Sequence, residues 1–180
     1  MKKSNQSLIK YFMPSFSSII WIITFLFVLL IGRFMLNTDG DLPLHLNLGK
    51  YILEIGKIPL TDIFSHTLSG KTVTQHEWSS ALFFEAINKI FGFPGVIFFC
   101  ALIIATTFWL LFKYLRRLSD SLIIAFLVAF FVMITSMVHW VARPHVMSFL
   151  LLVCWILLLD YLRRGNFKSW WLLPVLMLLW

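Results

Sequence analysis

Long apolar runs constrain the fold of this chain more than any other feature. Four runs cover residues 16–37, 94–112, 122–138 and 146–159, and a fifth begins at Trp170 and reaches the last residue, Trp180. A membrane-spanning helix needs about 20 predominantly apolar residues. Hydrophobic residues make up 60% of the chain and charged residues only 13%, whereas soluble domains have about 45–50% and about 25%. The sequence therefore predicts an all-α, polytopic membrane helix bundle with four full spans and a truncated fifth, as in a piece of a longer protein.

Basic residues mark alternate ends of these runs. They precede the first run and follow the second and the fourth: Lys2, Lys3, Lys10, Lys113, Arg116, Arg117, Arg163, Arg164 and Lys168. Because basic residues favour the cytoplasmic side, the pattern predicts a cytoplasmic basic N-terminus (1–15), a first span (16–37), an outer loop (38–93) and the remaining bundle (94–180). The first run is longer than the core of a cleaved signal peptide, which favours a retained span.

The net charge of +7 could suggest nucleic acid as a partner. The basic residues lie at span ends instead of forming one basic face, however. We therefore expect the lipid bilayer to be the partner and expect no nucleic acid.

The outer loop has the patterns of two short interfacial helices. An apolar stripe at helical spacing predicts the first of them: Leu44, Leu48, Tyr51, Ile52 and Ile55. Thr74 and Glu77 have the spacing of a capping box, which predicts that the second helix begins near Thr74. Its expected apolar side consists of Trp78, Leu82, Phe83, Ile87, Ile90 and Phe91, and Gly92-Phe93-Pro94-Gly95 should break it before the second span. The segment between the helices, 59–71, is typical of an ordered loop.

Chemistry-bearing residues gather on the predicted outer side. Asp39 and Asp41 follow the first span directly and are the candidate catalytic residues. The candidates for binding substrate or phosphate are His45, His76, Glu77, Arg143 and His145. Structural alternatives stay open: Asp41 as a helix N-cap, Glu77 in the capping box, Arg143 as a lipid head-group anchor, and histidines as interfacial hydrogen-bonding groups. Asp62 is expected to form a turn.

These residue types suit the transfer of a sugar from a lipid phosphate. A carboxylate can deprotonate the acceptor hydroxyl, and an arginine can bind the departing phosphate through two hydrogen bonds. We predict no dedicated set of metal ligands. The cofactor stays undetermined, with a divalent metal ion as the candidate, because a cation would also stabilise the leaving phosphate.

The outer-loop residues resemble the GT-C superfamily of polytopic glycosyltransferases. Within it, the chain is similar to bacterial membrane proteins of the dolichyl-phosphate-mannose-mannosyltransferase-like type. The resemblance rests on the run Asp39-x-Asp41-x-Pro43-x-His45-Leu46-x-x-Gly49-x-x-Ile52-x-x-x-Gly56-x-Ile58-Pro59-x-x-Asp62-x-Phe64-Ser65-x-Thr67, on Gly70 and Glu77-Trp78, and on Ala142-Arg143-Pro144-His145. It covers nearly all of this chain but only the N-terminal part of such a protein.

The resemblance implies an inverting membrane glycosyltransferase, or a fragment of one, that uses a polyprenyl-phosphate-linked sugar on the outer side of the bacterial cytoplasmic membrane. The role of general base or metal contact would fall to Asp39 or Asp41. Two alternatives remain: a transporter or flippase component for lipid-linked or anionic substrates, and a non-catalytic membrane scaffold. A transporter should carry ionisable residues near the bilayer midplane, and the predicted spans carry almost none there.

Overall fold

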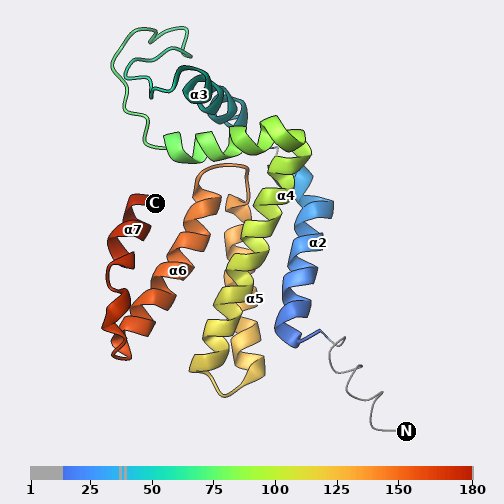
Figure 1. The fold of residues 1–180 in the computed structure, drawn as a ribbon. Coiled ribbons are helices and arrows are strands. Elements are labelled where there is room, and N and C mark those ends of the chain that lie inside the picture. Colours follow the sequence, from blue (N-terminus) through green and yellow to red (C-terminus); the bar gives the residue numbers. More distant parts are fainter. Residues whose placement is uncertain (1–13, 37, 39, 180) are drawn as a thin grey trace, which may run out of the picture.

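The computed structural model describes residues 14–36, 38 and 40–179, and this part of the chain is predominantly helical. The elements are α2 (Phe16–Leu36), α3 (Leu42–Ile55), α4 (Trp78–Leu118), α5 (Leu122–Ser136), η1 (Met137–His139), α6 (His145–Arg163), η2 (Phe167–Ser169) and α7 (Leu172–Leu179). Figure 1 shows α2, the long lower part of α4, α5 and α6 side by side, with α3 at one end of this bundle. The all-α prediction is confirmed for the described residues.

Three helical segments in the described part are long and apolar enough to cross a membrane: Trp78–Leu118, Leu122–His139 and His145–Arg163. Phe16–Leu30 and Phe167–Leu178 form shorter apolar helical stretches. A membrane helix bundle is therefore supported. The number of spans and the side on which the N-terminus lies stay predictions.

Helix α4 is the centre of the bundle and contacts α2, α3, α5 and α6. It is sharply bent at Gly92, whose backbone angles (φ 67°, ψ −172°) are open almost only to glycine. Pro94 lacks an N–H group and cannot continue the hydrogen-bond ladder across the bend. The break expected at 92–95 is confirmed as this bend, which divides α4 into an arm (78–91) across the end of the bundle and a stem (93–118) within it (Figure 1).

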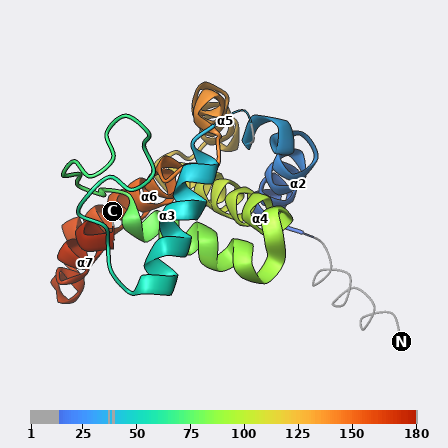
Figure 2. The ribbon, with the colours of Figure 1, turned by 90° about the horizontal axis from the view of Figure 1, so that it is seen from above.

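Helix α3 packs against the arm of α4, and Figure 2 shows the two helices crossing at the end of the bundle. Gly49 makes this close approach possible. A Cβ atom at this position would overlap the carbonyl oxygen of Ala81 and lie 2.7 Å from the Cβ of Glu85. The small residue therefore sets the distance between α3 and the arm.

This contact buries part of the predicted apolar stripe of α3: Leu48, Ile52 and, in part, Tyr51 pack against the arm. The buried residues are Leu42, His45, Leu48, Gly49 and Ile52. Leu44 and Ile55, which the hydrophobic spacing placed on the stripe, are 47% and 53% exposed. The face of α3 that meets the arm combines the close backbone approach at Gly49 with the apolar side chains of Leu48 and Ile52, which pack against Ala81.

The expected start of the second helix was also wrong. The arm begins at Trp78, and Glu77 at the N-cap position makes no side-chain capping hydrogen bond. The buried arm residues are Ala81, Phe84 and Glu85. Much of the predicted apolar side is instead exposed, including Phe83, Ile90 and Phe91. The carboxylate of Glu77 is available for another contact because it does not cap the helix.

The loop between α3 and the arm is ordered by its own backbone. Thr61 and Thr72 form an isolated antiparallel bridge, and the N–H of Asp62 donates to the carbonyl of Lys71 at 2.8 Å. One carboxylate oxygen of Asp62 accepts from the N–H groups of Phe64 (3.0 Å) and Ser65 (2.9 Å). Asp62 is thus the turn former that the sequence predicted.

Candidate functional site

An ion pair joins two predicted site residues that are far apart in the sequence. Arg143 Nη2 contacts Asp41 Oδ2, and both side chains are partly exposed, at 38% and 52%. Asp41 lies at the N-cap position of α3 without a side-chain capping bond. Its carboxylate therefore faces a cation on the turn between α5 and α6, and the capping alternative is wrong for its side chain.

The turn carrying Arg143 is held by alternating buried residues. The structure buries Trp140, Ala142, Pro144 and Val146. The residues between them, Val141, Arg143 and His145, are only partly buried. Trp140 is 1% exposed, and its indole N–H donates to Ser136 Oγ at 3.1 Å. Because this anchor is fixed in the core, Arg143 projects from a well-defined position.

His145 lies on the same turn as Arg143. Its Nε2 lies 2.8 Å from the carbonyl oxygen of His139, which accepts a hydrogen bond if Nε2 carries the proton. The two imidazole rings are 6.1 Å apart and nearly perpendicular. His145 therefore begins α6 with a fixed ring orientation.

His45 lies in the packed face of α3 with 6% of its surface exposed. Its Nε2 is 3.7 Å from Oε2 of Glu77, whose side chain is 56% exposed. Burial lowers the pKa of His45, the carboxylates of Glu77 and Asp41 oppose that effect, and His145 adds to the lowering. The net direction keeps His45 neutral at neutral pH, so its contact with Glu77 is a polar contact and not a full ion pair.

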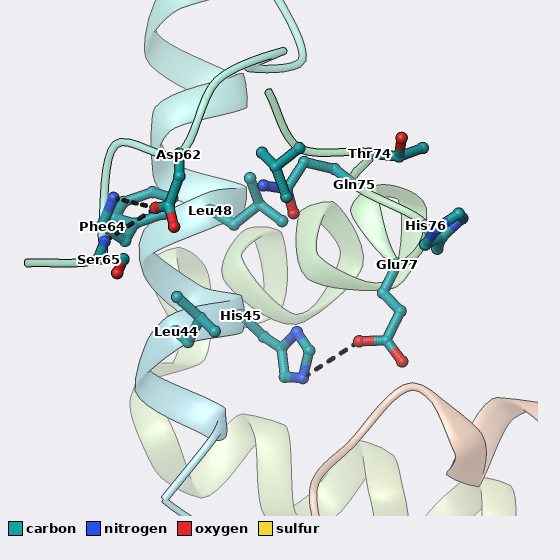
Figure 3. A pocket seen from close by; sticks show the side chains of 11 residues that line it. Leu44, His45, Leu48, Asp62, Phe64, Ser65, Thr74, Gln75, His76 and Glu77 are labelled. Carbon is teal, nitrogen blue, oxygen red and sulfur yellow. Dashed lines mark hydrogen bonds and ion pairs between the residues drawn. The ribbon is translucent and has the colours of Figure 1, made fainter. Parts of the chain in front are cut away.

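A cavity of about 490 Å³ opens beside this pair. We call it the loop cavity; it is lined by Leu44, His45, Leu48, Asp62, Phe64, Ser65, Val73, Thr74, Gln75, His76 and Glu77. Figure 3 shows Glu77 directed toward His45 at one side of this space, and Asp62 with Gln75 at another. The cavity is thus formed by α3, the ordered loop and the segment that leads into the arm.

The remaining predicted residues have different positions. Asp39 lies outside the described residues. His76 lines the loop cavity, but in Figure 3 its ring points away from His45. Among the residues that the structure describes, no group of three or more His, Cys, Asp or Glu side chains is arranged to hold a metal ion.

Sequence reasoning missed one polar residue of the loop cavity and one buried polar residue of the arm. Gln75 lines the loop cavity, and Glu85 is 8% exposed and accepts a hydrogen bond from Asn88 at 3.0 Å. The spacing of Glu85 after Ala81 would have placed it on the buried side of the arm. No local pattern distinguishes Gln75 from an ordinary loop residue.

The direction of the His45 pKa predicts how stability depends on pH. Its pKa is lower in the folded than in the unfolded state, so the unfolded state binds more protons as the pH falls. Neutral His45 therefore contributes to the free energy of unfolding at pH values above the ordinary histidine pKa of about 6.5. This contribution is lost as the pH falls below that value. Thermal unfolding in detergent between about pH 7.5 and pH 5 should show a smaller acid-side loss in His45→Gln than in the wild type.

A matched control for that measurement is His66→Gln, because His66 is an exposed histidine of the loop. Its variant should keep the wild-type slope. An unchanged slope in His45→Gln would contradict the prediction.

The arrangement brings a guanidinium, two carboxylates and two imidazoles to one end of the bundle. Asp41 and Arg143 are in contact, His45 is beside Glu77, and His145 is close enough to act electrostatically on His45. Such a group can bind an anion and move a proton. Comparisons with models of protein families, with curated proteins and with solved structures find no match to this chain.

Proposed function

We propose that this chain carries the sugar-transfer site of a membrane glycosyltransferase. Its donor would be a sugar linked to polyprenyl phosphate, and its acceptor a hydroxyl group at the outer face of the bacterial cytoplasmic membrane. The observation that carries the proposal is the Asp41–Arg143 ion pair, with His45 and Glu77 beside it. It supports an anion-binding group and proton-accepting groups within one site.

Arg143 is the phosphate-binding residue in this proposal. A guanidinium binds a phosphate through paired hydrogen bonds and stabilises negative charge as the phosphate leaves. Asp41 orients Arg143 through the ion pair. The base that takes the acceptor proton is a carboxylate of the same outer segment, for which Asp39 and Asp41 are the candidates from sequence. A divalent metal ion stays a candidate cofactor.

The distribution of charge favours transfer over transport. The stretches 95–112, 122–138 and 146–159 contain no Asp, Glu, Lys or Arg. Polar binding sites of transporters typically lie near the bilayer midplane, and charged groups there usually mark transport pathways. The gathered site residues lie instead on α3, at the start of the arm and on the turn that leads into α6, and Figure 1 shows these segments together at one end of the bundle.

A transfer assay with labelled donors tests the proposal. Nanodiscs containing the chain would be incubated with polyprenyl phosphate carrying labelled glucose, mannose, galactose or arabinose, together with a membrane glycan extract. We expect label to leave the lipid phosphate and enter a glycosylated product. Arg143→Gln should lower the rate by about 100-fold, the usual loss when one charge-stabilising donor is removed.

The matched control is Arg164→Gln. Arg164 also forms an ion pair, with Asp160 at 2.9 Å, but it follows α6 at the other end of the bundle. This variant should keep the wild-type rate. The proposal is wrong if none of the donors loses its label to a product, or if Arg143→Gln transfers sugar as fast as the wild type.

A further inference from the structure

The loop cavity lacks the positively charged side chain that Arg143 supplies at its ion pair with Asp41. The described residues that line it include the carboxylates of Asp62 and Glu77 and the polar groups of Ser65, Thr74 and Gln75, but no lysine or arginine. An anionic phosphate would meet like charge there without a compensating cation. The charge distribution therefore assigns phosphate to Arg143 and leaves the cavity to an uncharged ligand.

The lining also has the mixed character that a sugar ring requires. Leu44, Leu48 and Phe64 supply apolar surface, which suits the C–H faces of a pyranose. Hydroxyl, amide and carboxylate groups around them can exchange hydrogen bonds with sugar hydroxyls. The volume of about 490 Å³ falls within the range of about 300–1,000 Å³ typical of small-molecule sites.

Glu77 is placed where this cavity meets the rest of the site. Its side chain is 56% exposed, with Oε2 3.7 Å from His45 Nε2, and it lines the cavity. Asp41 does not line the cavity, and its carboxylate contacts Arg143. Of these two carboxylates, Glu77 is the one that an acceptor in the cavity would reach.

We propose that the loop cavity is the acceptor site, that it binds a neutral saccharide, and that Glu77 is the catalytic base in place of the candidates from sequence, Asp39 and Asp41. This inference rests on the proposed sugar-transfer function and deepens it. His45 lies beside the carboxylate of Glu77 at the cavity wall, with Nε2 3.7 Å from Oε2.

The step is a single displacement. Glu77 takes the proton from a saccharide hydroxyl, and the oxygen lone pair forms the new bond to the anomeric carbon of the donor sugar. The bond between that carbon and the phosphate oxygen breaks, and its electron pair stays on the phosphate, which leaves as polyprenyl phosphate beside Arg143. The proton on Glu77 then passes to solvent, so the products are the glycoside and the lipid phosphate.

Binding of simple sugars tests the cavity without any reaction. Saturation-transfer NMR would be recorded on the chain in nanodiscs with methyl glucoside, methyl mannoside, methyl galactoside and N-acetylglucosamine. We expect at least one of them to bind, and Leu44→Trp to abolish the signal by filling the cavity. Ile55→Trp is the matched control, since Ile55 is an exposed apolar residue of the same helix that does not line the cavity.

Kinetics test the role of Glu77. In the transfer assay, Glu77→Gln should lower kcat by about 100-fold or more, as expected for loss of a general base. It should leave the KM for the donor unchanged and remove the acid limb of the pH–rate profile. Glu54→Gln, on the exposed side of α3, should behave as the wild type. A purely structural role for Glu77 would instead lower the amount of folded protein and leave the pH profile unaltered.

The outcomes separate this inference from the proposed function. Sugar binding that Leu44→Trp removes, without transfer from any donor, would show a saccharide-binding cavity and overturn both the transferase and the role of this cavity as its acceptor site. Transfer by the wild type with full activity in Glu77→Gln would overturn Glu77 as the base. If none of the four sugars binds, or if binding survives in Leu44→Trp, the cavity is not the acceptor site.

Discussion

Replacement of Gly49 by leucine is expected to separate α3 from the arm of α4. A Cβ atom at this position already overlaps the carbonyl oxygen of Ala81, and backbone cannot move aside as a flexible side chain can. Overpacking a close contact costs about 1–3 kcal/mol and occasionally more, and here the upper end of that range applies. Thermal unfolding in detergent should show the loss, and trypsin should cleave after Lys57 faster than in the wild type.

Gly40→Leu is the matched control for that experiment. No atom lies within 4 Å of a Cβ built at Gly40, so this variant should unfold at the wild-type temperature. Wild-type stability and protection from trypsin in Gly49→Leu would show that α3 does not depend on this contact.

Exchanging the charges of Asp41 and Arg143 should separate the structural from the functional role of their ion pair. Asp41→Arg or Arg143→Asp alone places two like charges together, and each should lower stability by about 1 kcal/mol, because the pair is partly exposed. The double variant should recover most of that loss. It should not recover sugar transfer, since an aspartate at position 143 repels the donor phosphate, and we expect a rate at least about 100-fold below wild type.

Stability of the three variants would be measured by thermal unfolding, and activity by release of label from the polyprenyl phosphate donor. Sugar transfer at the wild-type rate in the double variant would contradict the assignment of Arg143 to the phosphate. Additive stability losses in the double variant would contradict the ion pair itself.

The helical elements could be predicted from the sequence because their signals are local. The apolar runs 122–138 and 146–159 agree closely with α5–η1 and α6. The break at 92–95 was predictable because Gly92 and Pro94 act on the backbone directly. The start of the arm could not be predicted. Thr74 and Glu77 have the spacing of a capping box, but the sequence does not show that Glu77 contacts His45 instead of capping the helix.

The site could be predicted only as a set of residues on one side. Asp41, His45, Glu77, Arg143 and His145 were all expected there, and the structure brings them together. Their pairing could not be derived, because Asp41 and Arg143 meet through the packing of α3 and of the α5–α6 turn on the rest of the fold. The polar lining of the loop cavity likewise depends on how the loop lies over α3.

By itself, the sequence determined that this chain is helical, that several of its helices are apolar enough to suit a membrane, and that residues 38–93 contain further helix. Hydrophobicity and backbone chemistry act within a few residues of each position, so these features are encoded locally. Only the tertiary structure decided which face of α3 is buried, that Arg143 holds Asp41, and that Glu77 faces a cavity. The physical reason is that these contacts join segments distant in the sequence: the close backbone approach at Gly49 sets α3 against the arm, and the buried Trp140 anchors the turn that carries Arg143.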